Sequence, residues 1–380
     1  SPRQHPPERP FRARPREASC HRLTESRVDE TQQSVLAIAG RIRMSSAALY
    51  MFDLLRGLHE EGCRVALICR NRPGERGRWR APFPAFRWRD VAAGPVALCE
   101  RERFEKTLHI PWPDVLHLFG KGLGRSGRRF VKHAGRPVIF TPDFTPGQSP
   151  EAARMQSVCD NVIALSQSMR ETLVNRVKIP RSKVRVVLPG IDLESYPLLP
   201  PDMESRTPVV GTVAPLETDR GQRLFLQSAR RLLDAGRHVE FMIGGDGPRE
   251  MALRKHARQL GLEQSVTFVT NLTDYRSVTA ALDVFVRPAA IGTIGYTVLE
   301  AMAMCKPVVA CSTAGIVEIV EDCETGFLVP KKDPDALAEA IGNLLDAPSL
   351  ARRMGAAGRA RVGEFFGMDR LVARTMQLYG

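Results

Sequence analysis

The sequence has no long apolar run, no C-x-x-C pair and no apolar leader. No stretch reaches the roughly 18 apolar residues of a membrane-spanning helix, which excludes an integral membrane protein of that kind. The first twenty residues, SPRQHPPERPFRARPREASC, lack the apolar segment of a secretory signal. The eight cysteines are scattered without the paired spacing of a zinc site. We therefore expect a cytoplasmic protein with reduced, mostly buried thiols.

The charge of the chain is unevenly distributed. The chain has 380 residues and a net charge of +13, and its length suits two domains. Residues 1–200 hold 34 Lys and Arg against 20 Asp and Glu, whereas the remainder holds 21 against 22. Uniform adaptation for solubility would not divide the charge in this way. We expect the basic half to face an anionic partner.

Apolar strand patterns alternate with helical patterns in two blocks, which predicts an α/β fold of two doubly wound, Rossmann-like domains. Residues 1–33 are rich in Arg, Pro and Glu and predict a disordered basic tail. The proline-rich segment 197–207 predicts a linker between domains at 34–196 and 208–363, and 364–380 is expected to be a closing helix. The strands are expected at 34–40, 63–69, 114–119, 137–140, 161–165, 184–188, 208–214, 239–245, 266–270, 283–288 and 307–311. Helices are expected at 45–61, 221–235, 249–260, 274–282, 295–304, 334–346, 348–361 and 365–378. Ligands of such sheets bind beyond the carboxyl ends of the strands, so a cleft between the domains is expected.

The stretch 287–330 carries the clearest chemical signal. A predicted strand ends at Pro288, and the loop GTIG (292–295) opens a helix, YTVLEAMAM. Glycines let the backbone approach a ligand, and a helix start offers N–H groups and the positive end of the dipole to a phosphate. Glu300 lies one to two turns inside this helix, where a carboxylate can accept two hydrogen bonds from a ribose diol.

Several strings resemble, in order, the signature of the retaining GT-B glycosyltransferases of glycosyltransferase family 4. They are GTVAPLETDRG (211–221), IGGDGP (243–248), DVFVRP, LEAMAM, KPVVA, AGIVEIV and TGFLVP, preceded by DNVIALSQSMRETL and KVRVVLPGIDLESY within 160–196. The resemblance extends over about residues 34–380.

The resemblance implies a hexosyltransferase-like enzyme that moves a sugar from a nucleotide-diphosphate sugar, with UDP or GDP, to an acceptor with retention of configuration. The donor binds the C-terminal domain, and a glycan or lipid-linked acceptor binds the N-terminal domain. It implies no cofactor and no metal, because N–H groups and basic side chains stabilise the leaving diphosphate. The D-x-D at Asp333–Asp335 is more simply a helix cap than a metal site.

The resemblance also implies site residues. By this resemblance, Gly211 and Thr212 lie near the phosphates of the donor, and Arg220 supplies a cation there. Gly245 and Asp246 line the floor of the nucleotide site, and Thr270 and Asn271 flank the nucleotide base. Backbone donors come from Thr293, Ile294, Gly295, Tyr296 and Thr297, and Glu300 holds the ribose. Gly40, Arg41 and Asp143 face the donor from the other domain, and Asp143 and Glu300 are the expected catalytic pair.

Three active-site positions depart from the family pattern. The family's first glutamate is replaced by Gly292, its Arg by Pro215 and its N-domain His by Asp143, while Arg220 stands for its Lys. An inactive relative that serves as a binding or partner subunit is therefore the alternative to an active transferase. The motif GLGRSG (122–127), with Asp143 about 20 residues on, leaves a dinucleotide oxidoreductase open, and a GT-B sugar-nucleotide epimerase is a further alternative.

Residues 70–90 hold seven arginines, two tryptophans and two phenylalanines. This composition suits a lipid headgroup layer, where charge meets phosphate and rings lie at the interface. It also suits single-stranded nucleic acid or a solvated surface loop. In the family that the chain resembles, this side of the N-terminal domain commonly meets a lipid or glycolipid acceptor. We therefore expect residues 70–90 to contact an anionic membrane surface on the cytoplasmic face, and we expect no specific nucleic acid as a partner.

Overall fold

The computed structural model describes residues 32–40, 42, 45–71, 81–87, 101–108, 110–120, 124–142, 150–155, 157–216, 221–270, 274–290 and 295–380. Nearly all of the predicted tail 1–33 and much of the Arg-rich segment 70–90 lie outside these ranges. The contacts described below all lie within residues 33–380, which cluster as one unit.

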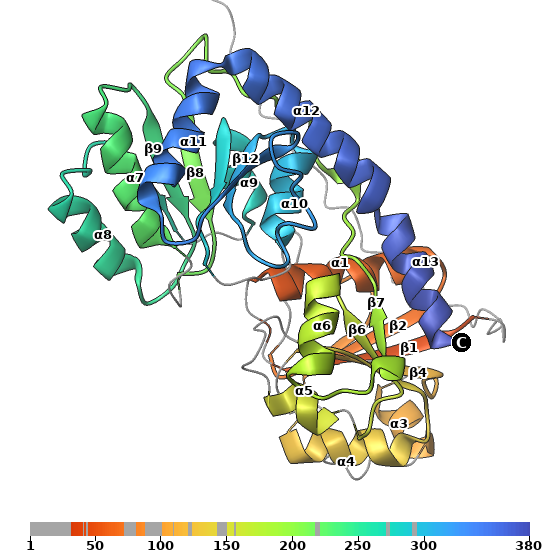
Figure 1. Ribbon diagram of the computed structural model, residues 1–380. Coiled ribbons are helices and arrows are strands. Elements are labelled where there is room, and N and C mark those ends of the chain that lie inside the picture. Colours follow the sequence, from red (N-terminus) through yellow and green to blue (C-terminus); the bar gives the residue numbers. More distant parts are fainter. Residues whose placement is uncertain are drawn as a thin grey trace, which may run out of the picture. The chain divides into compact units, whose positions relative to one another are not determined.

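The first sheet, called here the N-terminal sheet, has seven parallel strands in the order β3-β2-β1-β4-β5-β6-β7 (Figure 1). Its strands are β1 (Ser34–Ala39), β2 (Arg64–Cys69), β3 (Ala85–Arg87), β4 (Val115–Phe119), β5 (Val138–Thr141), β6 (Asn161–Ala164) and β7 (Val184–Val186). Its connecting helices are α1 (Ser46–Glu60), α3 (Arg101–Leu108), α4 (Gly124–Ala134), α5 (Pro150–Met155) and α6 (Gln167–Asn175).

The second sheet, the C-terminal sheet, has six parallel strands in the order β10-β9-β8-β11-β12-β13 (Figure 1). They are β8 (Val209–Val213), β9 (Glu240–Gly244), β10 (Val266–Val269), β11 (Val284–Arg287), β12 (Val308–Cys311) and β13 (Gly326–Val329). The helices are α7 (Gln222–Asp234), α8 (Glu250–Gln259), α9 (Arg276–Ala281), α10 (Tyr296–Ala303) and α11 (Pro334–Asp346), followed by α12 (Pro348–Phe365) and α13 (Met368–Tyr379). The strand order reverses beside β8 and β11, the usual place for a ligand in such sheets.

Burial explains why the apolar runs form central strands. All six residues of β1 are buried, as are all four of β11 and of β12. A strand that is apolar on both faces needs helices on both sides, which the α/β alternation supplies. The sequence prediction of two doubly wound sheets is therefore confirmed.

The last helix, α13, packs on α1 of the first half of the chain. A Cβ on Gly57 of α1 would lie 2.6 Å from Cγ2 of Val372 in α13, so glycine permits this close approach. Near the end of α13, the Tyr379 hydroxyl lies 2.7 Å from Nδ1 of His117, a buried residue of β4. The Nε2 atom of the same ring lies 2.8 Å from the Thr141 hydroxyl at the end of β5. Burial lowers the pKa of His117 to about 3.

Two edge strands were not predicted. β3 has three half-buried residues, and β13 has two half-buried residues among its four. Such short runs carry too little alternation to stand out from loops. Of the six cysteines that the structure describes, five are buried as expected and Cys323 is exposed in the turn before β13, while Cys20 and Cys99 lie outside the described residues. None of the helices in the described ranges combines the length and apolar character of a membrane span.

Candidate functional site

Several expected ligand residues of the second half follow the ends of strands β9, β10 and β11. Gly245 and Asp246 come directly after β9, Thr270 directly after β10, and Gly295 precedes α10 on the way from β11. Since β10, β9, β8 and β11 are neighbours and parallel, their carboxyl ends meet at one edge of the sheet. The fold therefore brings these residues to the same edge.

Backbone packing at this edge requires glycine at two positions. A Cβ on Gly245, whose φ is +147°, would lie 2.0 Å from the Ala214 carbonyl oxygen. A Cβ on Gly221, whose φ is +87°, would lie 1.9 Å from the Pro288 carbonyl oxygen. Gly221 is the N-cap of α7, so this contact places the start of α7 against the segment that leaves β11. Gly221 was not among the expected site residues, although a glycine at the start of a helical pattern is a signal for an N-cap.

The helices α7 and α10 begin in the same way. Each has a left-handed glycine at its N-cap, Gly221 at φ +87° and Gly295 at φ +67°, and neither N-cap residue makes a side-chain capping hydrogen bond. The start of a helix carries backbone N–H groups and the positive end of the helix dipole. Two such helix starts after adjacent strands suit an anion with more than one phosphate.

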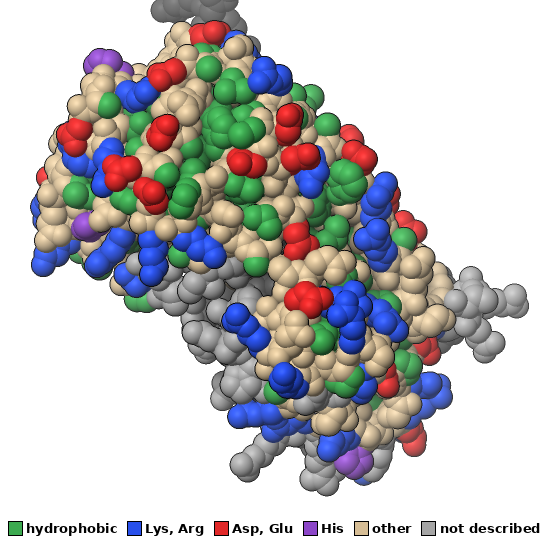
Figure 2. Space-filling view, viewed as in Figure 1, with side chains coloured by type: hydrophobic (Ala, Val, Ile, Leu, Met, Phe, Trp, Pro, Cys, Tyr) green, Lys and Arg blue, Asp and Glu red, His purple; other side chains and the backbone are tan. Residues whose placement is uncertain are grey.

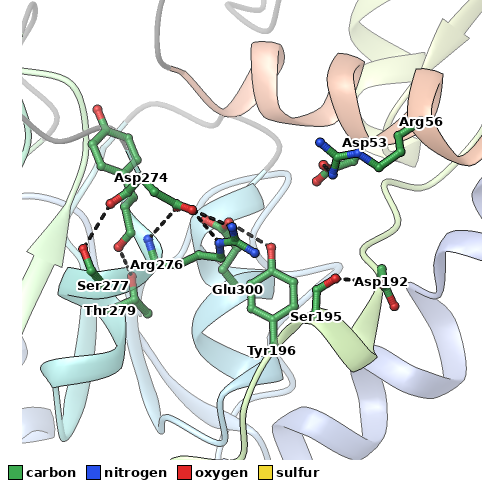
Figure 3. A network of polar contacts seen from close by, with 11 residues as sticks. Asp53, Arg56, Asp192, Ser195, Tyr196, Asp274, Arg276, Ser277, Thr279 and Glu300 are labelled. Atoms are coloured by element: carbon green, nitrogen blue, oxygen red, sulfur yellow. Dashed lines mark hydrogen bonds and ion pairs between the residues drawn. The ribbon is translucent and has the colours of Figure 1, made fainter. Parts of the chain in front are cut away.

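Glu300 lies on the second turn of α10 and is fully buried. Its Oε1 accepts a hydrogen bond of 3.0 Å from the hydroxyl of Tyr196, a residue 104 positions earlier in the chain (Figure 3). The Tyr196 ring lies beneath the guanidinium of Arg276, 5.8 Å from carbon to ring centroid. Arg276 is itself fixed by Asp274 through Nε–Oδ2 and Nη2–Oδ2 contacts of 2.7 and 2.6 Å. A ribose would reach the Glu300 carboxylate only by replacing a group that now covers it.

Tyr296, the first residue of α10, directs its hydroxyl away from solvent. The hydroxyl hydrogen-bonds the Asp53 carboxylate of α1 and lies 3.3 Å from the Gly190 carbonyl oxygen. Tyr296 has no exposed surface, and Asp53 is 5% exposed. The Tyr296 side chain therefore joins the start of α10 to α1.

Other expected residues lie within packed structure or outside the described ranges. A Cβ on Gly211 would lie 2.4 Å from Cδ2 of Leu282, so packing alone explains this glycine. Thr212 and Thr297 are buried. Gly40 is also buried, just after β1. Six expected residues lie outside the described residues: Arg41, Asp143, Arg220, Asn271, Thr293 and Ile294.

Two local sequence interpretations are confirmed. The Asp333 side chain accepts hydrogen bonds from the backbone N–H groups of Asp335 and Ala336 and so caps α11. The motif GLGRSG leads into a helix, because α4 begins at Gly124.

Two family models match the chain. One, described as "Glycosyl transferases group 1", matches residues 207–347, and the other, "Glycosyltransferase Family 4", matches residues 47–195. The two matches together span most of the chain and divide it between its two sheets.

Curated relatives carry glycosyltransferase names. The chain is 32% identical over 297 residues to a D-inositol 3-phosphate glycosyltransferase of Streptomyces scabiei, an alignment over 71% of this chain and 62% of that protein. It is 31% identical over 150 residues to the alpha-D-kanosaminyltransferase of Streptomyces kanamyceticus, over 39% of each chain. The chain thus spans less than two thirds of these two relatives. A Xylanimonas cellulosilytica protein named D-inositol 3-phosphate glycosyltransferase is 24% identical, over 87% of this chain and 90% of its own.

Solved structures share the architecture. A glycosyltransferase from Rickettsia africae superposes with a TM-score of 0.75 at 17% identity, over 92% of this chain and 98% of its own. HepE of Anabaena, solved with UDP and glucose, superposes with a TM-score of 0.75 at 19% identity, over 91% and 99%. These likenesses show the fold. With two parallel Rossmann-like sheets, matches to both family models and GT-B structural neighbours, the chain belongs to glycosyltransferase family 4 and has the GT-B fold.

Proposed function

We propose that the chain transfers a sugar from a nucleoside-diphosphate sugar to an acceptor, with retention of anomeric configuration. The observation that carries this proposal is the pair of helix starts after β8 and β11, each with a left-handed glycine at its N-cap. In a diphosphate-sugar donor, negative charge develops on the leaving diphosphate as the glycosidic bond breaks. Oriented N–H groups at the starts of α7 and α10 would stabilise that charge.

Further observations support a nucleotide at this edge. Glu300 stands one turn beyond Tyr296, and its buried carboxylate would accept hydrogen bonds from a ribose once the atoms that cover it move aside. Figure 2 shows Lys and Arg side chains gathered along the lower margin of the upper half of the molecule in that view. Positive charge of this kind draws a polyanionic donor toward the site. HepE of Anabaena has been solved with UDP-glucose, which makes UDP-sugars the first donors to test.

The proposed division of labour follows the two sheets. Residues 208–363 would bind the donor and 34–196 the acceptor, with 197–207 as the linker and 364–380 as a helix that returns to the first part. Asp143 and Arg41 would face the donor from the acceptor side, and Arg220 would supply a cation to the diphosphate. We propose a glycan or lipid-linked acceptor and a cytoplasmic protein whose residues 70–90 contact an anionic membrane surface.

An inactive binding subunit is the second candidate, favoured by specific substitutions. Pro215 follows β8 by two residues and has no backbone N–H to give a phosphate. Gly292 supplies no carboxylate where the family has one. A protein of this kind would bind the nucleotide sugar and leave it intact.

A thermal-shift screen of UDP- and GDP-sugars, followed by a transfer assay on every hit, tests the proposal. A donor present at about 100 times its dissociation constant should stabilise the protein by about 2.7 kcal/mol. Transfer to an acceptor with the anomeric configuration of the donor, read by NMR of the product, supports the full proposal. Binding without any turnover supports the inactive subunit, and the absence of any nucleotide binding refutes both.

A further inference from the structure

The tyrosine at the end of the first half of the chain touches the carboxylate proposed to hold the donor. Tyr196 follows a short 3-10 turn, Leu193–Ser195, and precedes the linker 197–207. It is 2% exposed, and its hydroxyl donates to Oε1 of Glu300 at 3.0 Å. Figure 3 shows this hydroxyl directed at the Glu300 side chain from the segment that leads into the linker.

The rest of Tyr196 is held on several sides. Its carbonyl oxygen accepts from the Nη1 atom of Arg359 in α12 at 2.9 Å, and the same atom also bonds the Ala303 carbonyl at the end of α10. The guanidinium of Arg276 lies over the ring and is fixed in turn by Asp274. A phenol held in this way has little freedom to turn, so its hydroxyl defines one position for the carboxylate oxygen that it contacts.

We propose that Tyr196 is a positioning residue for the donor: its hydroxyl fixes the Glu300 carboxylate in the orientation that accepts the ribose diol. This inference rests on the proposed function. A carboxylate has about four acceptor positions, and the tyrosine uses one of them while setting the plane of the group. Since a ribose diol must meet both oxygens at a defined angle, loss of the hydroxyl costs donor affinity through misorientation and removes no direct contact with the ligand.

The test combines the loss of the Tyr196 hydroxyl with the loss of the ribose hydroxyls. Isothermal titration would compare UDP with 2′,3′-dideoxy-UDP, and GDP with its dideoxy analogue, on the full-length protein and on Tyr196→Phe. Phenylalanine keeps the buried ring and its contact with Arg276. The unaltered protein should bind the nucleotide with the diol about tenfold more tightly than the dideoxy analogue, as expected for hydrogen bonds to a charged group. In Tyr196→Phe the ratio should fall to about threefold or less.

A purely structural role for Tyr196 would weaken both nucleotides equally and leave the ratio unchanged. Because both affinities are measured on one preparation, partial loss of folded protein cancels in the ratio. Tyr379→Phe is the matched control, since it removes another buried hydroxyl, one that pairs with His117. Its ratio should equal that of the unaltered protein.

The outcomes separate this inference from the proposed function. An unchanged ratio in Tyr196→Phe, with a diol preference in the unaltered protein, overturns the positioning role and leaves the proposed function standing. A protein that binds neither UDP nor GDP overturns the proposed function and this inference with it. A fall in the ratio for Tyr196→Phe but not for Tyr379→Phe supports the positioning role.

Discussion

The contact between Tyr296 and Asp53 can be tested by a double-mutant cycle. It joins the first residue of α10 to the middle of α1, and both side chains are buried. Tyr296→Phe removes a hydrogen bond to a carboxylate, which costs about 1.5–3 kcal/mol of unfolding free energy. Asp53→Ala removes the acceptor and also its 3.5 Å contact with Arg56. Each single change removes one partner of a buried polar group, which adds to its cost.

The double variant should be less damaging than the sum of the two single variants. Once both groups are gone, neither single-variant penalty for a lost partner applies. We therefore expect a coupling free energy of about 1.5–3 kcal/mol, as found for residues that share a hydrogen bond. As a control, Asp53→Ala combined with Tyr379→Phe should be additive within about 0.5 kcal/mol, because the Tyr379 hydroxyl pairs with His117.

The choice of probe matters for this measurement. All three tryptophans, Trp79, Trp88 and Trp112, lie in the first half of the sequence, and Trp112 is buried against Phe104 at a centroid distance of 5.1 Å. Fluorescence therefore reports the part built on the N-terminal sheet, and urea unfolding must also be followed by far-UV circular dichroism. Separate transitions would each need their own analysis. A coupling below about 0.5 kcal/mol in every transition would refute the view that this bond joins α1 to α10.

Three further predictions concern His117, Glu318 and Gly292. Burial lowers the pKa of His117 to about 3 against about 6.5 in the unfolded chain, so the unfolded state binds the proton more readily between these values. Stability should fall as pH drops from 6.5 toward 3, and urea titrations should show a shallower fall for His117→Gln. The Glu318 carboxylate accepts hydrogen bonds from the backbone N–H groups of Gln167 and Ser168 at 2.8 and 2.9 Å, at the start of α6. Glu318→Ala should therefore lower the free energy of unfolding by about 1 kcal/mol and speed amide hydrogen exchange in α6. An unchanged exchange rate would contradict this capping role. Gly292→Glu should restore a donor carboxylate and raise transfer activity, and an unchanged or lower rate in the transfer assay would count against a lost donor contact.

The sequence predicted the central strands because their burial is local and continuous. The β12 run is apolar along its full length, and the β1 run is apolar after Ser34, so both faces of these strands suit burial. The start of α11 was also predictable, because the Asp333 side chain accepts hydrogen bonds from backbone N–H groups that lie only two and three residues further along the chain. Patterns that are complete within one short window determine structure without knowledge of the rest of the chain.

The fine structure of the candidate site could not be predicted in the same way. Tyr196, which bonds Glu300, lies 104 residues from it, and Asp53, which bonds Tyr296, lies 243 residues away, so neither pairing leaves a local pattern. Gly211 was expected near a phosphate from its motif, yet the space for a side chain is filled by Leu282. Motifs identify which segments lie at the carboxyl edge of the C-terminal sheet, whereas the role of each side chain there depends on packing between segments that are distant in the sequence.

The return of α13 to α1 affects the order in which the chain completes itself during synthesis. All strands of the N-terminal sheet are synthesised before those of the C-terminal sheet, but the helix that covers Gly57 and pairs with His117 is synthesised after both sheets. A nascent first half would carry an uncovered apolar face on α1 through the production of the whole second half. The first half therefore acquires its full packing only after both sheets have been synthesised.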